Sequence, residues 1–374
     1  MFVSCLSANI WIIHVTFERL KIVVSPEIIG KMKKILVTGG TGYIGSHTVV
    51  ELQQSGFEVI IVDNLSNSLI SVLDNIGKIT GSIPEFEQFD LSDQTATKEF
   101  FSRHGDLSGI IHFAAYKAVG ESMIKPLEYY RNNVVSMLNI LEGMKEQGIR
   151  DIVFSSSCTV YGQPDELPVT EAAPVKQAWS PYGNTKQMCE DILRFTTRAF
   201  PVRAIALRYF NPIGAHESAL IGELPLGIPN NLVPYITQTA IGLRPCLSVF
   251  GNDYNTPDGT AIRDYIHVVD LAKAHVVAVK RMIENKGKAG LEIFNLGTGI
   301  GYSVLDAIHA FEKASGVKLN YKLVDRRPGD TEKVWADTSF ANKELGWKAE
   351  KGLDEMMASA WKWEKALAVK RERQ

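Results

Sequence analysis

Two short motifs carry residues that could bind a dinucleotide and move a proton beside it. The first is glycine-rich, runs from Gly39 to Gly45 and follows the apolar run 35–37. Glycines at this spacing between a strand and a helix let backbone amides approach a pyrophosphate, and the helix N-terminus adds a partial positive charge. The candidate cofactor residues of this turn are Gly39, Gly42, Tyr43, Ile44 and Gly45.

An acidic residue follows the next apolar run. Asp63 comes directly after Val59–Val62, where a carboxylate at a strand end can accept hydrogen bonds from the adenosine ribose. This placement favours NAD over a phosphorylated nicotinamide cofactor. The alternative interpretation is that the three glycines form an ordinary turn and that Asp63 is a surface residue. The strand, the glycines and the acidic residue follow one another in the expected order, which favours the cofactor-binding interpretation.

The second motif holds Tyr182 and Lys186, four residues apart on one face of an expected helix. A positive charge beside a phenol favours phenolate and so lowers its pKa from about 10. Such a tyrosine can accept a proton from a hydroxyl while hydride leaves the same carbon for a cofactor. Ser157 follows the strand 152–154 and is expected to hydrogen-bond the reacting oxygen; the alternative is a serine-rich turn that caps the sheet.

These residues need a scaffold that brings strand ends together. Apolar runs alternate with helical patterns, which predicts a doubly wound parallel α/β sheet of the Rossmann type. Strands are expected near Ile35, Val59, Phe86, Ile110, Ile152 and Ile205, and helices over 43–54, 126–147 and 182–200. We expect an NAD-binding domain over residues 33–212.

After Arg208 the sequence becomes rich in proline, glycine and asparagine, as in loops that hold ligands. A further strand over 292–296 and a helix over 304–314 follow. We therefore expect a smaller, partly interleaved α/β substrate domain over residues 213–374, which closes over the carboxyl edge of the sheet.

Composition restricts the possible partners. The chain has 374 residues, 45% of them hydrophobic, with 40 basic and 42 acidic side chains, so no global field attracts nucleic acid or an anionic membrane. The four cysteines lack the spacing of a zinc site or a disulfide framework, which predicts reduced thiols, no metal and a cytoplasmic protein. Residues 1–32 are expected to be an extension outside the fold, because Met32 stands directly before the residues that begin the first strand. The apolar patches of this extension are too short for a membrane span of about 20 residues.

Four longer stretches resemble one known family. They are Phe113–Ser122, Tyr209–Pro212, Gly227–Leu232 and Arg263–Val268. From about Lys33 onward the chain resembles the extended short-chain dehydrogenase/reductase family, and within it the nucleotide-sugar epimerases.

The resemblance implies roles for residues along the first half of the chain. In similar proteins Asp63 and Asn64 hold the adenosine ribose, and Asp90 and Leu91 flank the adenine. The rest of the cofactor's path is lined by Phe113, Ala114, Ala115, Lys117, Asn132 and Phe210, with Phe210 beside the nicotinamide.

The resemblance also assigns the reacting groups. Tyr182 is the acid/base, Lys186 binds the nicotinamide ribose and lowers the pKa of the phenol, and Ser157 shares the proton transfer. The substrate positions, besides Ser157 and Tyr182, are Asn211, Asn231, Leu232, Arg263, Arg327, Asp330 and Val334. Two arginines can neutralise a diphosphate, although either one alone would be interpreted as part of a surface salt bridge.

The activity implied is the reversible 4-epimerisation of UDP-glucose and UDP-galactose through a 4-keto sugar, with NAD held tightly, as in galactose metabolism. Alternatives are the N-acetylated UDP-sugars or UDP-uronic acids, a 4,6-dehydratase, and a non-enzymatic dinucleotide sensor. Val334 is intermediate in size at a position that can limit room for a 2-acetamido group. A dehydratase usually has an Asp-Glu pair after a threonine where this chain has Ser157-Cys158-Thr159, and sensors commonly lose the tyrosine.

The family further implies a homodimer through helices 126–147 and 182–200.

Overall fold

A seven-stranded parallel sheet forms the centre of the protein. The computed structural model describes residues 32–327 and 330–372, and Lys33–Gln374 form one compact unit. The strand order is β10-β6-β5-β4-β1-β2-β3, so the direction of winding reverses between β1 and β4. The strands are β1 (Lys34–Thr38), β2 (Glu58–Asp63), β3 (Glu85–Gln88), β4 (Gly109–His112), β5 (Asp151–Ser157), β6 (Arg203–Tyr209) and β10 (Leu291–Leu296). This confirms the doubly wound α/β fold.

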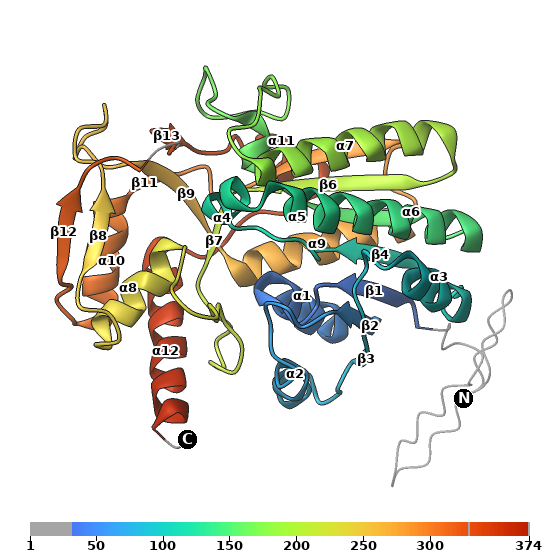
Figure 1. Cartoon of the computed structure of the whole chain (residues 1–374), viewed down its shortest axis with the longest axis horizontal. Coiled ribbons are helices and arrows are strands. Elements are labelled where there is room, and N and C mark those ends of the chain that lie inside the picture. The colour runs from blue at the N-terminus through green and yellow to red at the C-terminus, as the bar shows by residue number, and fades with distance from the viewer. Residues whose placement is uncertain (1–31, 328–329, 373–374) are drawn as a thin grey trace, which may run out of the picture. The chain divides into compact units, whose positions relative to one another are not determined.

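Helices cover both faces of this sheet (Figure 1). Successive strand residues point to opposite faces, and Ile35 and Val37 of β1 join one apolar core while Leu36 joins the other. The first core is completed by α1 (Tyr43–Gln54), α2 (Val72–Thr80) and α9 (Val268–Ile283). The second is completed by α3 (Gln94–Arg103), α6 (Ser136–Gln147) and α7 (Pro181–Ala199). Burial on both faces explains why the strands are continuous apolar runs.

The expected helix 126–147 is present but not uniform. It is built from α5 (Pro126–Tyr130), a π-helical turn (Arg131–Val135) and α6, and it is preceded by α4 (Val119–Ile124). A π-turn inside a helix widens the backbone locally and often marks a functional position. It lies where the chain places two adjacent asparagines, Asn132 and Asn133.

The remaining elements form a second set of layers. Strand β9 (Ile262–His267) pairs with β7 (Asn211–Ile213), β11 (Gly301–Ser303) and β13 (Lys333–Val334), and β8 (Leu247–Phe250) pairs with β12 (Tyr321–Val324). Helices α8 (Leu232–Ala240), α10 (Val304–Ser315) and α12 (Leu353–Arg371) pack into their core, and α11 (Ser339–Glu344) packs near β10.

Two elements from the second half of the chain belong to the large sheet's layers. Strand β10 pairs with β6 at the sheet edge, and α9 lies beside α1 (Figure 1). The alternation of apolar runs indicated β10 but not α9. The extension expected over residues 1–32 lies outside the described residues, except for Met32. Among the residues that the structure describes, no helix has the length and apolar character needed to cross a bilayer.

Candidate active site

A cleft of about 680 Å³ lies at the carboxyl ends of the central strands. It sits where the strand order reverses between β1 and β4, the position at which open α/β sheets bind ligands. The cleft contains all the predicted cofactor residues except Phe210: Gly39, Gly42, Tyr43, Ile44, Gly45, Asp63, Asn64, Asp90, Leu91, Phe113, Ala114, Ala115, Lys117, Asn132, Tyr182 and Lys186.

The glycine turn fits closely against its neighbours. Gly39 has a φ of +69°, and a Cβ there would lie 2.8 Å from the backbone nitrogen of Ala114. A Cβ on Gly45 would lie 2.2 Å from the carbonyl oxygen of Gly39. Gly42 precedes α1 without a side-chain cap, so the first amides of the helix stay available to an anion.

Asp63 holds the far side of this turn. Its Oδ2 accepts from the amide of Thr41 at 3.3 Å, and its Oδ1 accepts from the amide of Leu65 at 2.9 Å and the hydroxyl of Ser68 at 3.3 Å. The turn after β2 thus wraps around one carboxylate. Three residues of this turn, Ser66, Asn67 and Ser68, line the cleft and were not predicted, although a run of serine and asparagine after a strand is a recognisable turn signal.

Asp90 and Asn64 lie side by side in the cleft wall. The Nδ2 of Asn64 donates to Asp90 Oδ2 at 3.0 Å, while Ser92 donates to Asp90 Oδ1 through both its amide and its hydroxyl. Burial by itself raises the pKa of Asp90, but the hydrogen bonds from Ser92 and Asn64 outweigh it and the net pKa is lowered. Asp90 therefore stays a carboxylate, which can act only as an acceptor.

Tyr182, Lys186 and Ser157 meet where α7 crosses the end of β5. The Nζ of Lys186 donates to the carbonyl oxygen of Ser155 at 2.7 Å and lies 5.8 Å from the centre of the Tyr182 ring. The side chain of Ser157 lies close enough to the phenol of Tyr182 to lower its pKa. Helix α7 begins at Pro181, capped by the Ser180 hydroxyl, so the tyrosine stands in its first turn.

The protonation of this pair is governed mainly by burial. Burial raises the pKa of Tyr182 to about 12, and the side chain of Ser157 acts in the opposite direction. Burial lowers the pKa of Lys186 to about 8, while Cys189 and Glu190 act to raise it. The lowering of the phenol's pKa by Lys186 stays a prediction: in this structure burial of the hydroxyl is the largest cause of the shift, and Ser157 supplies the lowering.

Asn133 was missed by sequence reasoning, yet it fixes the cleft wall to α7. It is 3% exposed, and its side chain pairs with the amide and carbonyl of Tyr116 at 2.8 and 3.0 Å. Its Nδ2 also lies 3.0 Å from the hydroxyl of Thr185, the residue before Lys186. The Nδ2 of Asn132, which lines the cleft, donates to Asn133 Oδ1 at 2.9 Å. Two adjacent amides inside a helical pattern were the available signal, since asparagine is a poor helix former.

The predicted substrate residues fall into separate groups. Asn231 lines the cleft, where its Nδ2 donates to Glu223 Oε1 at 2.5 Å, and Lys117 Nζ lies 3.4 Å from the same carboxylate. Leu232 follows Asn231 as the first residue of α8. Glu223 was not predicted and carries no motif of its own.

A second group gathers around β9, beyond the end of β5. Arg263 of β9 is opposite Val334 of β13, and β9 also pairs with β7, which begins at Asn211. Phe210 and Val334 lie in one apolar cluster against which Cys158 packs. This group is therefore adjacent to Ser157 through the chain, although its members do not line the cleft described above.

Arg327 and Asp330 pair with each other. Arg327 donates to Asp330 from Nη2 at 2.7 Å and from Nε at 3.2 Å, and its guanidinium lies 5.6 Å from the ring centre of Phe250. Its side chain is 55% exposed. Arg327 and Asp330 thus form a partly exposed salt bridge. A surface salt bridge was the alternative to a role in diphosphate binding when either arginine was considered alone.

Comparisons with known proteins agree with this arrangement. A family model described as GDP-mannose 4,6 dehydratase matches residues 36–360. The chain is 54% identical over 332 residues to the UDP-glucose 4-epimerase of Pasteurella multocida, covering 88% of this chain and 97% of that protein. It is 50% identical over 340 residues to the human UDP-glucose 4-epimerase, with coverages of 89% and 97%.

Solved structures give the same result. The UDP-glucose-4-epimerase of Stenotrophomonas maltophila, with bound NAD and formylated UDP-arabinopyranose, superposes with a TM-score of 0.87 at 47% identity, covering 90% of this chain and 99% of that one. The enzyme from Bifidobacterium longum, in complex with NAD⁺ and UDP, gives 0.86 at 48% identity, with coverages of 89% and 98%.

Proposed function

The chain belongs to the UDP-glucose 4-epimerase family, and we propose that it interconverts UDP-glucose and UDP-galactose with a tightly held NAD. The observation that carries the proposal is one piece of geometry. Tyr182, beside Ser157, and Lys186, held by the carbonyl of Ser155, stand at the cleft that the glycine turn opens. A proton acceptor thus lies beside a site shaped for a dinucleotide.

The cleft fits NAD by its own chemistry. The turn at Gly39–Gly45 has no space for a Cβ at Gly39 or Gly45, as a close approach of backbone to pyrophosphate requires. Asp63 and Asp90 supply carboxylate acceptors where the adenosine hydroxyls and base would lie, and a carboxylate disfavours a 2′-phosphate. When bound there, NAD would accept hydride from C4 of the sugar and return it to the opposite face.

The protein's own groups would handle the proton. The phenolate form of Tyr182 would accept the proton of the C4 hydroxyl, and the resulting phenol would later return it, with Ser157 sharing the transfer. Lys186 places a positive charge near Tyr182, which favours the phenolate that accepts the proton. Since the reaction is redox-neutral, the protein needs to hold its cofactor through every turnover.

The nucleotide end of the substrate requires cations and amides. We assign this role to Asn211, Asn231, Leu232 and Arg263, with Val334 close to the sugar. Arg327 and Asp330 would have to exchange their mutual ion pair for contacts with the diphosphate, which is possible at low cost because such exposed pairs contribute little. In domain terms, residues 33–212 would hold NAD and 213–374 the UDP-sugar.

The related activities are less well supported by the residues present. A 4,6-dehydratase needs additional acid/base groups to eliminate water, and Ser157, Cys158 and Thr159 at the end of β5 do not supply them; burial raises the pKa of Cys158 to about 12. A dinucleotide sensor would not need Tyr182 and Lys186 in this arrangement. The N-acetylated UDP-sugars remain a second candidate substrate pair because Val334 is smaller than an aromatic residue.

We further propose a homodimer and a cytoplasmic location. Apolar side chains lie exposed along α5 and α7, including Leu127 at 77% and Phe195 at 66%, and such a patch suits packing against a second copy. The described cysteines, Cys158, Cys189 and Cys246, are free thiols, as expected in a reducing compartment. Sedimentation of the wild type and a Phe195→Glu variant tests the dimer.

The test of the function is direct. Purified protein is incubated with UDP-galactose without added NAD, and UDP-glucose is sought by chromatography. Product formation supports both epimerisation and a retained cofactor. Accumulation of a keto sugar or a uronic acid would refute the assignment.

A further inference from the structure

The cleft is covered on one side by residues 214–231, here called the covering segment. Ten of its residues line the cleft: Leu220, Ile221, Gly222, Glu223, Leu224, Pro225, Leu226, Ile228, Asn230 and Asn231. The segment has little regular structure of its own. Its position must therefore be fixed by contacts with other elements.

One of those contacts reaches the glycine turn directly. The hydroxyl of Tyr43, the first residue of α1, donates to the carbonyl oxygen of Gly214 at 2.6 Å. Lys117, on the opposite wall, lies 3.4 Å from Glu223 and 5.8 Å from the centre of the Tyr43 ring. The covering segment thus closes against the part of the cleft that fits the pyrophosphate.

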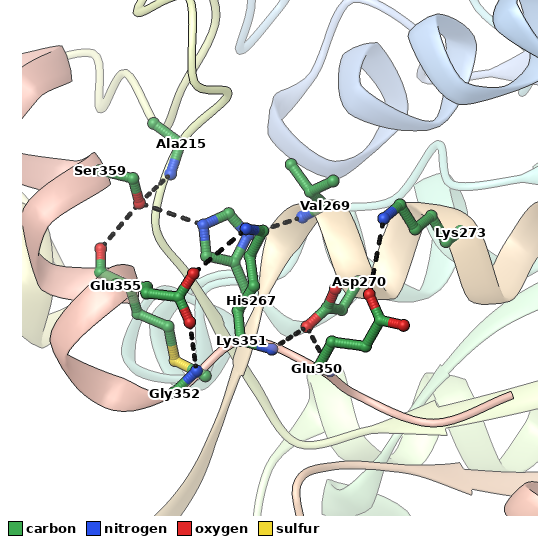
Figure 2. A network of polar contacts seen from close by, with 11 residues as sticks. Ala215, His267, Val269, Asp270, Lys273, Glu350, Lys351, Gly352, Glu355 and Ser359 are labelled. Atoms are coloured by element: carbon green, nitrogen blue, oxygen red, sulfur yellow. Dashed lines mark hydrogen bonds and ion pairs between the residues drawn. The ribbon is translucent and has the colours of Figure 1, made fainter.

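Three further contacts come from α12, near the C-terminus. The hydroxyl of Ser359 accepts from the amide of Ala215 at 3.1 Å and lies 3.1 Å from Nε2 of His267 (Figure 2). Lys362 donates to the carbonyl of Glu217 at 2.5 Å, and the indole of Trp363 donates to the carbonyl of Glu223 at 2.9 Å. Three positions of the segment, Ala215, Glu217 and Glu223, are therefore bonded to a single helix.

Two glycines of the segment show how closely it fits α12. A Cβ on Gly214, which has a φ of +91°, would lie 2.9 Å from the Ser359 hydroxyl. A Cβ on Gly222 would lie 2.6 Å from the ring of Trp363. Trp363 itself is 7% exposed and lines the cleft. The segment and the helix face are complementary in shape as well as in hydrogen bonding.

Ser359 is held in turn by His267, the last residue of β9, which directly precedes α9. Val269 donates to Nδ1 of His267 at 3.1 Å, which leaves the proton on Nε2, facing Ser359 (Figure 2). Ser359 donates its own proton to the carbonyl of Met356 at 2.9 Å, so its oxygen is free to accept from both His267 and Ala215. Helix α9 packs beside α1. His267, directly before α9, and the glycine turn, directly before α1, therefore belong to the same layer.

From these contacts we propose that α12 retains the cofactor: Ser359 and Trp363 are positioning residues that hold the covering segment closed over the pyrophosphate end of the cleft. The inference rests on the proposed function, because a redox-neutral epimerase has to keep its NAD bound through each cycle. Loss of either anchor lets the segment open more often, and NAD leaves faster.

The chain offers a matched pair for the test. Trp363 and Trp361 lie on the same helix and are 7% and 9% exposed. Trp363 donates to Glu223 of the covering segment, whereas Trp361 packs edge-on against Phe311 of α10, away from it. Trp363→Phe removes the indole donor that reaches the segment, and Trp361→Phe makes the same change where the segment is not touched.

The experiment measures NAD release from the full-length protein as purified. Wild type, Trp363→Phe, Ser359→Ala and Trp361→Phe are desalted, mixed with excess labelled NAD, and followed for exchange; melting temperature is recorded for each. Trp363→Phe and Ser359→Ala should release NAD about fivefold faster, the factor that one neutral hydrogen bond represents. Activity lost on dilution should return when NAD is added, which simple unfolding would not allow.

The outcomes separate the two proposals. If the wild type neither retains NAD nor epimerises UDP-galactose, the proposed function fails. If the wild type does both, and Trp363→Phe and Ser359→Ala exchange NAD at its rate, the role of α12 is wrong. Acceleration by Trp361→Phe equal to that by Trp363→Phe would also overturn it, because the effect would then reflect general loosening of the helix.

Discussion

Arg208 of β6 and Glu190 of α7 form an ion pair from which solvent is almost completely excluded. The two residues are 1% and 2% exposed, and Arg208 Nε donates to Glu190 Oε1 at 2.9 Å. Ser156, which is opposite Arg208 in the β5–β6 register, donates to the same carboxylate oxygen at 2.5 Å. The pair therefore joins α7, which carries Tyr182 and Lys186, to the end of the strand that meets them.

Removing one partner of this ion pair should strongly lower the free energy of unfolding. Arg208→Met leaves Glu190 buried without its counter-charge, and we expect a loss of about 3–5 kcal/mol in the free energy of unfolding. The double variant Arg208→Met/Glu190→Met should recover most of it, since apolar replacements of a buried pair are often tolerated. Denaturant unfolding measures both values.

A control for this prediction lies at the other end of the same strands. Arg203 and Asp151 form a two-point ion pair, with side chains 16% and 10% exposed. Because this pair is closer to solvent, Arg203→Met should cost less than Arg208→Met. Equal losses for the two variants would contradict the burial argument.

Tyr182→Phe removes the phenol oxygen but keeps the ring. We expect kcat for UDP-galactose to fall by about 10²–10⁴, the range associated with a general acid/base, while the NAD content stays that of the wild type. Rate assays and absorbance of the purified protein give the two quantities. A variant with more than a tenth of the wild-type kcat would mean that another group moves the proton.

Gly45→Ala tests the close approach in the glycine turn. The new Cβ would lie 2.2 Å from the carbonyl oxygen of Gly39, so the turn must shift, and NAD bound per protein should fall at least tenfold. Gly120→Ala, where a Cβ meets no atom within 4 Å, serves as the control and should leave the NAD content unchanged. Full NAD content in the Gly45→Ala protein would show that the pyrophosphate does not lie against this turn.

Acid should destabilise the protein through its buried histidines. Burial lowers the pKa of His112 to about 3 and that of His275 to about 4, whereas both should titrate near 6.5 when unfolded. As the pH falls below 6.5, the unfolded chain takes up protons that the folded protein does not, so stability is present above that pH and is lost below it. At pH 5 each such histidine should cost about 2 kcal/mol.

Urea unfolding at pH 7 and pH 5 checks this dependence. His275 lies between the rings of Phe113 and Tyr209, at 4.7 and 5.8 Å between centroids, so His275→Phe keeps an aromatic ring in place. The variant should lose less stability than the wild type over the same pH interval. An identical loss would show that His275 is not the titrating group.

Val334→Tyr addresses the breadth of substrates. Val334 is 6% exposed and shares an apolar cluster with Phe210, so a larger side chain must occupy space at the sugar end of the site. We expect turnover of UDP-N-acetylgalactosamine to decrease by at least tenfold relative to UDP-galactose, in line with steric exclusion. Comparable N-acetyl turnover in both proteins would refute the size argument.

The large sheet could be predicted because its signal is local. Buried parallel strands such as Ile35–Val37 and Ile152–Phe154 are continuous apolar runs, and a glycine turn has to follow a strand directly. The helices over 43–54 and 126–147 were predicted at their observed bounds. Helix α9 was not, since Val268–Ile283 carries no distinctive turn before it, and only its packing beside α1 makes its position evident.

The sequence by itself determined the fold class, the residues of the cofactor cleft and the placement of Tyr182 and Lys186 on one helix, because residue type and spacing along one helix or strand are enough to place those groups. Tertiary structure alone decided the contacts between distant segments. It set the burial that raises the pKa of Tyr182, the support of Lys186 by Ser155, the ion pair of Arg327 with Asp330, and the attachment of residues 214–231 to α12. These depend on desolvation and on approach between residues as much as 145 positions apart, which no local pattern encodes.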